Sequence, residues 1–91
     1  MQIRWTSKAL GDLGRLHAFL APVNPRAAAA VFEMLSAAPD TLLEQPHLGF
    51  ALPEFAPRNV RRLIVGDYEL RYEVAEKALW ILRLWHTRED R

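Results

Sequence analysis

Six of the basic or imidazole side chains in the last third of the chain could form a surface for anions: Arg61, Arg62, Arg71, Arg83, His86 and Arg88. Guanidinium groups that converge bind phosphates or an acidic protein, and a histidine beside them can transfer a proton near neutral pH. The alternative is a solvated sheet face on which the arginines pair with Glu69 and Glu73 of neighbouring strands. Spacing alone favours this pairing.

Other kinds of site find no support in the sequence. The chain has no cysteine, so it contains no thiolate nucleophile and no zinc–thiolate site, and it lacks a glycine-rich phosphate-binding loop. His17, His47 and His86 fall on a predicted helix, in a proline-rich loop and at a strand end, without the spacing of metal ligands. We therefore expect no metal and no cofactor.

The composition predicts one globular domain spanning residues 1–91. Hydrophobic residues make up 51% of the chain and charged residues 25%, which allows a small core. The formal charge is +1, with −1 in residues 1–57 and +2 in residues 58–91, too weak an asymmetry to argue nucleic-acid binding. The sequence contains no run resembling a signal peptide or long enough to span a bilayer, so we expect a soluble cytoplasmic protein.

Two helices are predicted in the first half of the chain. Thr6 or Ser7 can cap the first, whose apolar stripe extends to Pro22, with Asp12 and Arg15 largely off that stripe. Asn24 followed by Pro25 marks the start of the second helix. Pro39 should kink or break it, leaving a short turn over residues 39–44. Together the helices form an antiparallel hairpin.

Strands are predicted at residues 2–5, 60–65, 68–75 and 78–86, from alternation or apolar runs bounded by turns such as Gly66-Asp67. Residues 78–86 are apolar on both faces for much of their length and should form the central strand. Residues 45–59 form an ordered connection pinned by its apolar groups. The predicted fold is α+β, in the order β-α-α-β-β-β, with the helical hairpin packed on a mostly antiparallel sheet.

Two tryptophans lie on the last predicted strand. Neighbouring residues of a strand point to opposite faces, and positions 80 and 85 differ in parity. Trp80 and Trp85 should therefore face opposite ways, one in the core and the other beneath a loop or a partner.

Five short motifs occur in a fixed order along the chain: Trp5-Thr6-x-x-Ala9-x-x-Asp12-Leu13, Asn24-Pro25-x-Ala27-Ala28, Leu43-x-x-Pro46-x-x-Gly49, Arg61/Arg62-Leu63-x-Val65-x-x-Tyr68-x-Leu70-x-Tyr72-x-Val74 and Ile81-Leu82-Arg83-Leu84-Trp85-His86-x-Arg88-x-Asp90. In order and spacing they resemble the RelE/ParE toxin superfamily, over nearly the whole chain. The resemblance implies the same fold and a toxin of a type II toxin–antitoxin system, as in plasmid-stabilisation systems.

The superfamily has two main activities. RelE-like members cut messenger RNA on the ribosome, and ParE-like members inhibit DNA gyrase by binding. Glu69 stands where RelE-like toxins carry an arginine, and no tyrosine follows Arg88. A carboxylate there would repel the scissile phosphate. The resemblance therefore favours a ParE-like toxin, which is not an enzyme.

Two alternatives stay open. One is a ribosome-dependent endoribonuclease in which His86 serves as a general acid or base beside Arg88. The other is a degenerate toxin that acts only in antitoxin binding and promoter autoregulation, contacting DNA indirectly through the antitoxin.

The resemblance also implies partners and their contact residues. The target, DNA gyrase or in the alternative the ribosome and messenger RNA, would contact Arg61, Arg62, His86 and Arg88. A ParD-like antitoxin would fold over the hairpin and sheet. The residues expected to bind the antitoxin are Leu13, Leu16, Leu20, Val31, Leu35 and Trp85.

Overall fold

A computed structural model describes residues 1–89 of the chain. Its elements follow the predicted order, with one additional short strand and one turn of 3₁₀ helix. They are β1 (Gln2–Trp5), α1 (Ser7–Leu20), α2 (Pro25–Glu44), β2 (Phe50–Ala51), a 3₁₀ turn (Pro53–Phe55), β3 (Val60–Val65), β4 (Tyr68–Val74) and β5 (Ala78–His86). No helix within this range is long and apolar enough to cross a membrane.

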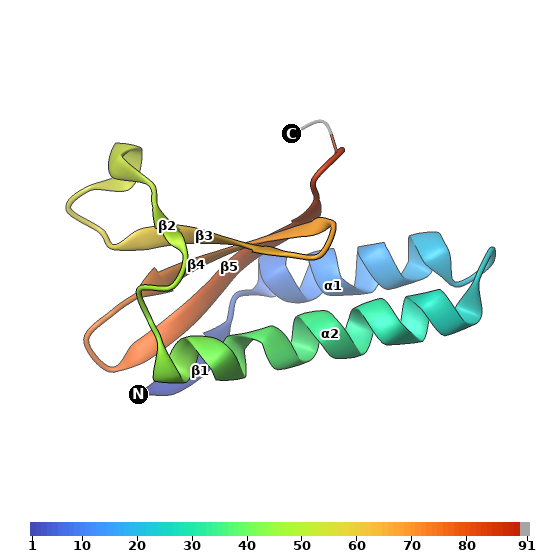
Figure 1. Cartoon of the computed structure of the whole chain (residues 1–91), viewed down its shortest axis with the longest axis horizontal. Helices are drawn as coiled ribbons and strands as arrows, with labels where there is room; N and C mark the ends of the chain where they lie inside the picture. The colour runs from blue at the N-terminus through green and yellow to red at the C-terminus, as the bar shows by residue number, and fades with distance from the viewer. Residues whose placement is uncertain (90–91) are drawn as a thin grey trace.

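The strands form one five-stranded sheet in the order β1-β5-β4-β3-β2, on which the two helices lie side by side (Figure 1). β1 is parallel to β5, and every other pair is antiparallel. This confirms the predicted α+β fold with its helical hairpin on a mostly antiparallel sheet. The central strand is β4, however, and not β5 as predicted, because the short β2 extends the sheet on the far side of β3.

Local sequence explains where the helices begin. The Thr6 hydroxyl accepts a hydrogen bond from the Ala9 amide at 3.0 Å, and the Asn24 side chain accepts one from the Ala27 amide at 3.1 Å. Each bond satisfies an amide that has no partner inside its helix. The far end of the hairpin projects beyond the sheet (Figure 1), which leaves Phe19 80% exposed and Val23 85% exposed.

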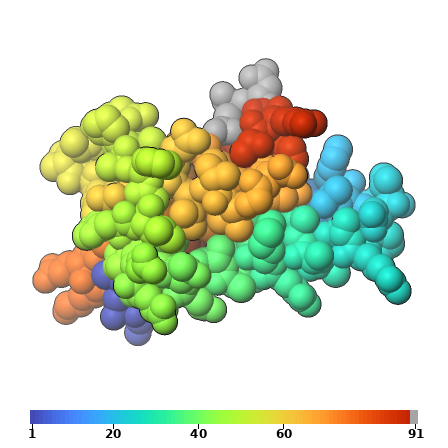
Figure 2. All heavy atoms as spheres, viewed as in Figure 1, coloured from blue at the N-terminus to red at the C-terminus, as the bar shows by residue number. Residues whose placement is uncertain are grey.

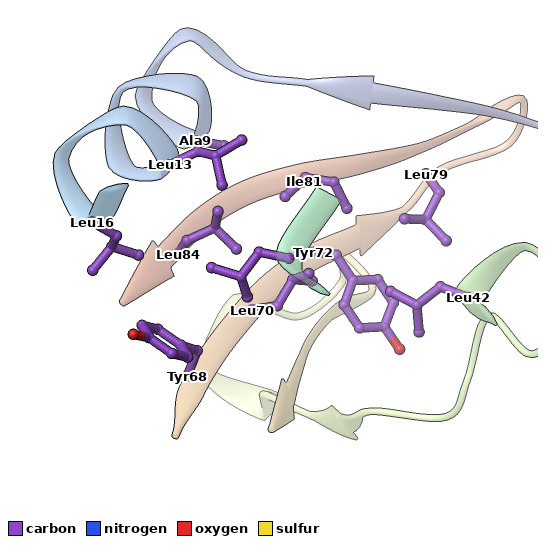
Figure 3. Packing of buried hydrophobic residues seen from close by; sticks show 11 residues of the cluster. Ala9, Leu13, Leu16, Leu42, Tyr68, Leu70, Tyr72, Leu79, Ile81 and Leu84 are labelled. Carbon is purple, nitrogen blue, oxygen red and sulfur yellow. The ribbon is translucent and has the colours of Figure 1, made fainter. Parts of the chain in front are cut away.

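The core fills the space between the helices and one face of the sheet. Figure 3 shows its members from α1, α2 and the strands converging: Ala9, Leu13, Leu16, Leu42, Tyr68, Leu70, Tyr72, Leu79, Ile81 and Leu84. In β4 the residues Tyr68, Leu70 and Tyr72 alternate toward this face. Glu69 and Arg71 consequently project from the opposite face, which we call the open face.

The predicted break at Pro39 is wrong, because α2 continues through this residue to Glu44. Pro39 itself is buried, and Leu35 and Leu42 on either side of it are fully buried. A proline costs a helix one hydrogen bond and a steric clash. Burial of the apolar residues on both sides of it offsets that cost, so tertiary packing overrides the local signal.

The connection between α2 and β3 is held mainly by polar contacts, and only partly by the apolar groups that were expected to pin it. Leu48 and Phe50 are exposed, whereas the buried Tyr72 hydroxyl donates to the Pro46 carbonyl at 2.8 Å and accepts from the Gly49 amide at 2.9 Å. Burial raises the pKa of Tyr72. A side chain at Gly49 would lie 2.6 Å from the Arg62 carbonyl oxygen, so this position requires glycine.

Candidate functional site

The edge of β5 is covered by the side chains of Thr6, the N-cap of α1, and of Asp12 within α1. β1 pairs only with the first part of β5, from Ala78 to Ile81. Beyond that point, the Thr6 hydroxyl donates to the Leu82 carbonyl at 2.9 Å, and the Asp12 carboxylate accepts from the Leu84 amide at 2.9 Å. The Thr6 and Asp12 side chains thus satisfy backbone hydrogen-bonding groups of β5 beyond the point where β1 ends.

Asp12 is the centre of these contacts and is 5% exposed. It also accepts two hydrogen bonds from Arg83, at 2.7 and 3.1 Å. Burial raises the pKa of Asp12, but the bonds from Arg83 and the Leu84 amide outweigh it and hold the pKa below the ordinary value of 3.8. The helical pattern had placed Asp12 off the apolar stripe of α1, yet it is buried against the strand edge.

A β-bulge in β5 changes which side chains share a face. Arg71 of β4 is paired with Arg83, but the next residue, Tyr72, is paired with Ile81, so Leu82 is the additional residue. The bulge reverses the alternation, and Trp80 and Trp85, which lie opposite Glu73 and Glu69, share the open face. The prediction that the two tryptophans face opposite ways is therefore wrong.

The open face and the adjoining edge of β5 carry a group of side chains that we call the arginine network. It consists of the paired charges Asp12, Arg62, Glu69, Arg71 and Arg83 and the ring of Trp85. Glu69 is only 2% exposed and forms ion pairs with Arg71 at 3.3 Å and Arg62 at 3.8 Å. The guanidinium groups of Arg71 and Arg83 lie 4.7 and 5.0 Å from the centre of the Trp85 ring. Buried carboxylates and an aromatic ring thus hold these cations.

Arg61 and Arg62 do not act together. Arg61 points to the side opposite Arg62 and donates to the carbonyls of Gly49 and His47, at 2.8 and 3.3 Å. It therefore fastens the connection before β3, whereas Arg62 belongs to the arginine network. The four predicted target residues do not form one surface, because adjacent strand residues alternate between faces.

His86 and Arg88 lie together at the far end of β5, on the rim of a pocket of about 520 Å³ that we call the end pocket. The pocket lies between α1 and the residues after β5. It is lined by Arg15, Leu16, Phe19, Leu20, Tyr68, His86, Arg88 and Glu89. The His86 ring packs edge-on against Tyr68, with 5.1 Å between the ring centres. The lining therefore combines apolar side chains with charged groups, which suits a protein partner.

Residues 87–89, which we call the tail, close one side of the end pocket. The Thr87 amide donates to the Asp67 carbonyl at 2.8 Å, beside the β3–β4 turn, and the Arg88 amide donates to Nδ1 of His86 at 3.1 Å. Figure 2 shows the tail, in red, standing out from the surface next to that turn. Both carboxylate oxygens of Glu89 lie 3.0 Å from Nη1 of Arg15. Burial raises the pKa of Glu89, but Arg15 and the His86 amide together lower it below 4.5.

The residues predicted to bind an antitoxin lie in different environments. Leu13, Leu16 and Leu35 belong to the buried core, Val31 packs against that core, and Trp85 belongs to the arginine network. Leu16 and Leu20 also line the end pocket. The buried positions present little surface to a partner, because the helical stripe marks the face that packs on the sheet.

Sequence reasoning missed four residues of the end pocket as candidate contacts: Arg15, Phe19, Tyr68 and Glu89. Phe19 was assigned to the apolar stripe of the first helix, although it is exposed beyond the sheet. Arg15 and Glu89 are far apart in sequence, and no periodic pattern links them. Among residues 1–89, no group of three or more acidic or histidine side chains could hold a metal ion.

Comparison with known proteins gives concordant results. Residues 3–91 match the family model described as the ParE toxin of type II toxin–antitoxin system, parDE. Two toxins of Caulobacter vibrioides are similar over most of both chains. The one named RelE2 is 34% identical over 94% of this chain and 94% of its own, and the one named RelE1 is 31% identical over 92% and 90%.

A solved structure shares the fold. It is described as the chromosomal ParDE TA system from P. aeruginosa and superposes with a TM-score of 0.78 at 24% identity, covering 94% of this chain and 95% of its own.

Proposed function

The chain belongs to the ParE toxin family of type II toxin–antitoxin systems, and on that basis we propose that it inhibits DNA gyrase by binding and not by cutting RNA. The toxin is then held inactive by a ParD-like antitoxin, and both act in the cytoplasm. The names of its Caulobacter vibrioides relatives contain RelE, so messenger RNA cleavage is the activity to test against.

The position of Glu69 carries this proposal. A nuclease that clamps a phosphate needs arginines whose charge is available to the transition state. Here the buried Glu69 carboxylate pairs with Arg62 and Arg71, and Asp12 pairs with Arg83. Each of these arginines of the open face therefore already has a carboxylate partner, and a bound phosphate would have to compete with those carboxylates.

The contacts of His86 support the same proposal. Its Nδ1 accepts a hydrogen bond from the Arg88 amide, so the neutral ring carries its own proton on Nε2. In that tautomer no lone pair is left to accept a proton from a ribose hydroxyl. His86 is thus better suited to a contact surface than to general-base catalysis.

The end pocket is the part of the molecule best suited to bind a partner. We assign target contact to His86 and Arg88, since Arg61 is engaged with the loop before β3 and Arg62 with Glu69. The antitoxin would cover Phe19 and Leu20 at the same end of α1, in place of the buried leucines first considered. Apolar groups beside cations suit a partner segment that carries both apolar and acidic residues.

A supercoiling assay tests the proposal. Purified toxin should inhibit gyrase-catalysed supercoiling of relaxed plasmid, and addition of its antitoxin should restore it. In a translation extract the same toxin should leave messenger RNA intact. Cleavage that is lost in His86→Ala would establish the nuclease reading instead, and harmless expression without antitoxin would favour the degenerate toxin.

A further inference from the structure

We infer that Arg15 and Glu89 form a latch that positions Arg88 over the end pocket, so that Arg15 is a positioning residue for target binding. This inference rests on the proposed contact between Arg88 and the target. It assigns a role to a pair of residues that the sequence did not single out.

On the helix side of the latch, contacts other than Glu89 orient the Arg15 guanidinium. Nη2 of Arg15 lies 3.4 Å from the Asp12 carboxylate and 3.4 Å from the Leu84 carbonyl oxygen. Asp12 in turn is anchored to β5 through the Leu84 amide. This leaves Nη1 of Arg15 directed at the tail, where it reaches both oxygens of Glu89.

The tail side of the latch is a single carboxylate with two tasks. Glu89 binds Arg15, and its Oε1 also accepts the His86 amide at 3.1 Å. The remaining bonds of the tail join it to His86 and to the β3–β4 turn. The ion pair is therefore the contact that draws the tail toward α1 and closes the pocket.

Arg88 directly precedes Glu89 in the chain and is exposed. Within residues 1–89 its guanidinium forms no ion pair, and it lines the pocket beside Glu89. An exposed cation on an anchored segment that pairs with no carboxylate of residues 1–89 is preorganised for an acidic group on a partner. Loss of the latch would leave the charge present but the tail free to move.

The exposure of the latch makes it separable from folding. The side chains of Arg15 and Glu89 are 47% and 28% exposed, and such pairs contribute little to stability. Removal of the pair should loosen the tail without unfolding the chain. This difference permits a direct test.

The test combines hydrogen exchange with toxicity in the full chain. In Arg15→Gln and in Glu89→Gln, the amides of residues 87–89 should exchange about two- to fivefold faster. Core amides such as those of Leu70 and Ile81 should exchange at unchanged rates. Growth inhibition after induction without antitoxin should be lost in both variants and partly restored in Arg15→Lys, which keeps a cation at this position.

Arg26→Gln is the matched control, because it removes an exposed arginine that forms no ion pair within the described residues. This variant should change neither the hydrogen-exchange rates of the tail amides nor the growth inhibition. Unchanged exchange of the tail in Arg15→Gln would refute the latch. Faster exchange with full toxicity would refute the positioning role. A wild-type chain that does not inhibit growth would refute the proposed function instead, while the exchange rates still decide whether the latch exists.

Discussion

The arginine network and the end pocket are built from the same residue types around the same strand, but they use charge differently. In the network, the buried Asp12 carboxylate accepts a hydrogen bond from the Leu84 amide at the edge of β5, and the buried Glu69 carboxylate pairs with Arg62 and Arg71. In the pocket, the pair between Arg15 and Glu89 is partly exposed, and the neighbouring Arg88 pairs with no carboxylate among the described residues. A buried carboxylate makes an arginine structural, whereas an exposed, unneutralised arginine is available to a partner.

Of the substitutions in these two regions, one at Asp12 should lower the free energy of unfolding most. Asp12→Ala removes the partner of Arg83 and leaves the Leu84 amide without its acceptor at the edge of β5. The Arg83 side chain left behind is 36% exposed and is solvated by water, so the main cost is the buried Leu84 amide without an acceptor, about 1–3 kcal/mol. Urea unfolding should therefore show a free energy of unfolding lower by about this amount.

The matched variant in the end pocket is Glu89→Ala. It breaks an exposed pair and should lower the free energy of unfolding by less than about 1 kcal/mol. Equal losses in Asp12→Ala and Glu89→Ala would mean that the two regions do not differ in the way their charges are used.

A second, smaller effect is expected in acid. The folded state holds the pKa of Asp12 and that of Glu89 below their ordinary values of 3.8 and 4.5. Both carboxylates therefore stabilise the fold fully above those values, and this stabilisation is lost as the pH falls below them. Asp12→Asn, which keeps an acceptor for the Leu84 amide, should flatten the fall in stability between about pH 5 and pH 2.

Added salt distinguishes the two contributions. Glu89 is partly exposed, so 0.5 M salt should weaken its share of the pH dependence, whereas the buried Asp12 is screened much less. Denaturation monitored across this pH range at low and high salt measures both. A pH dependence in Asp12→Asn as steep as in the wild type would contradict the assignment.

The sequence was sufficient for most of the fold, because alternation, caps and turns are local, but the continuity of α2 through Pro39, the short β2 and the central position of β4 depend on tertiary packing. The limits of strands 2–5, 60–65 and 78–86 and the start of each helix agree with the structure for this reason. The bulge at Leu82 could not be predicted, since it depends on how β5 is aligned with β4. The two tryptophans were therefore predicted on opposite faces, whereas Trp85 lies on the same side as Trp80.

The candidate site was harder to predict than the fold. Alternation already implied that Arg61 and Arg62 point to opposite faces, but the two residues were grouped by charge. The burial of Asp12 depends on where β1 stops pairing with β5, and the Arg15–Glu89 pair joins residues far apart in the sequence. Contacts of this kind follow from the packing of α1 across the end of the sheet and from no periodic pattern.

The smallest effect on stability is expected at Phe19, where a substitution should alter antitoxin binding and not folding. Phe19 is 80% exposed, so Phe19→Ser should change the free energy of unfolding by less than about 0.5 kcal/mol. If the end pocket binds the antitoxin, the same change should weaken toxin–antitoxin affinity at least about tenfold, because a buried aromatic anchor often contributes more than 1.4 kcal/mol to an interface. Titration calorimetry of the purified pair measures this affinity.

Ile64→Thr is the matched control, since Ile64 is a 44% exposed apolar residue of β3 that lies opposite Glu69 on the open face. It should leave the antitoxin affinity unchanged. If Ile64→Thr weakened the complex and Phe19→Ser did not, the antitoxin would bind over the arginine network. The network would then be a recognition surface despite its paired charges, because a partner would be contacting arginines whose charge is already neutralised. Whether buried carboxylates keep the arginines of the network from binding a partner is thus decided by which side chain the antitoxin covers, Phe19 or Ile64.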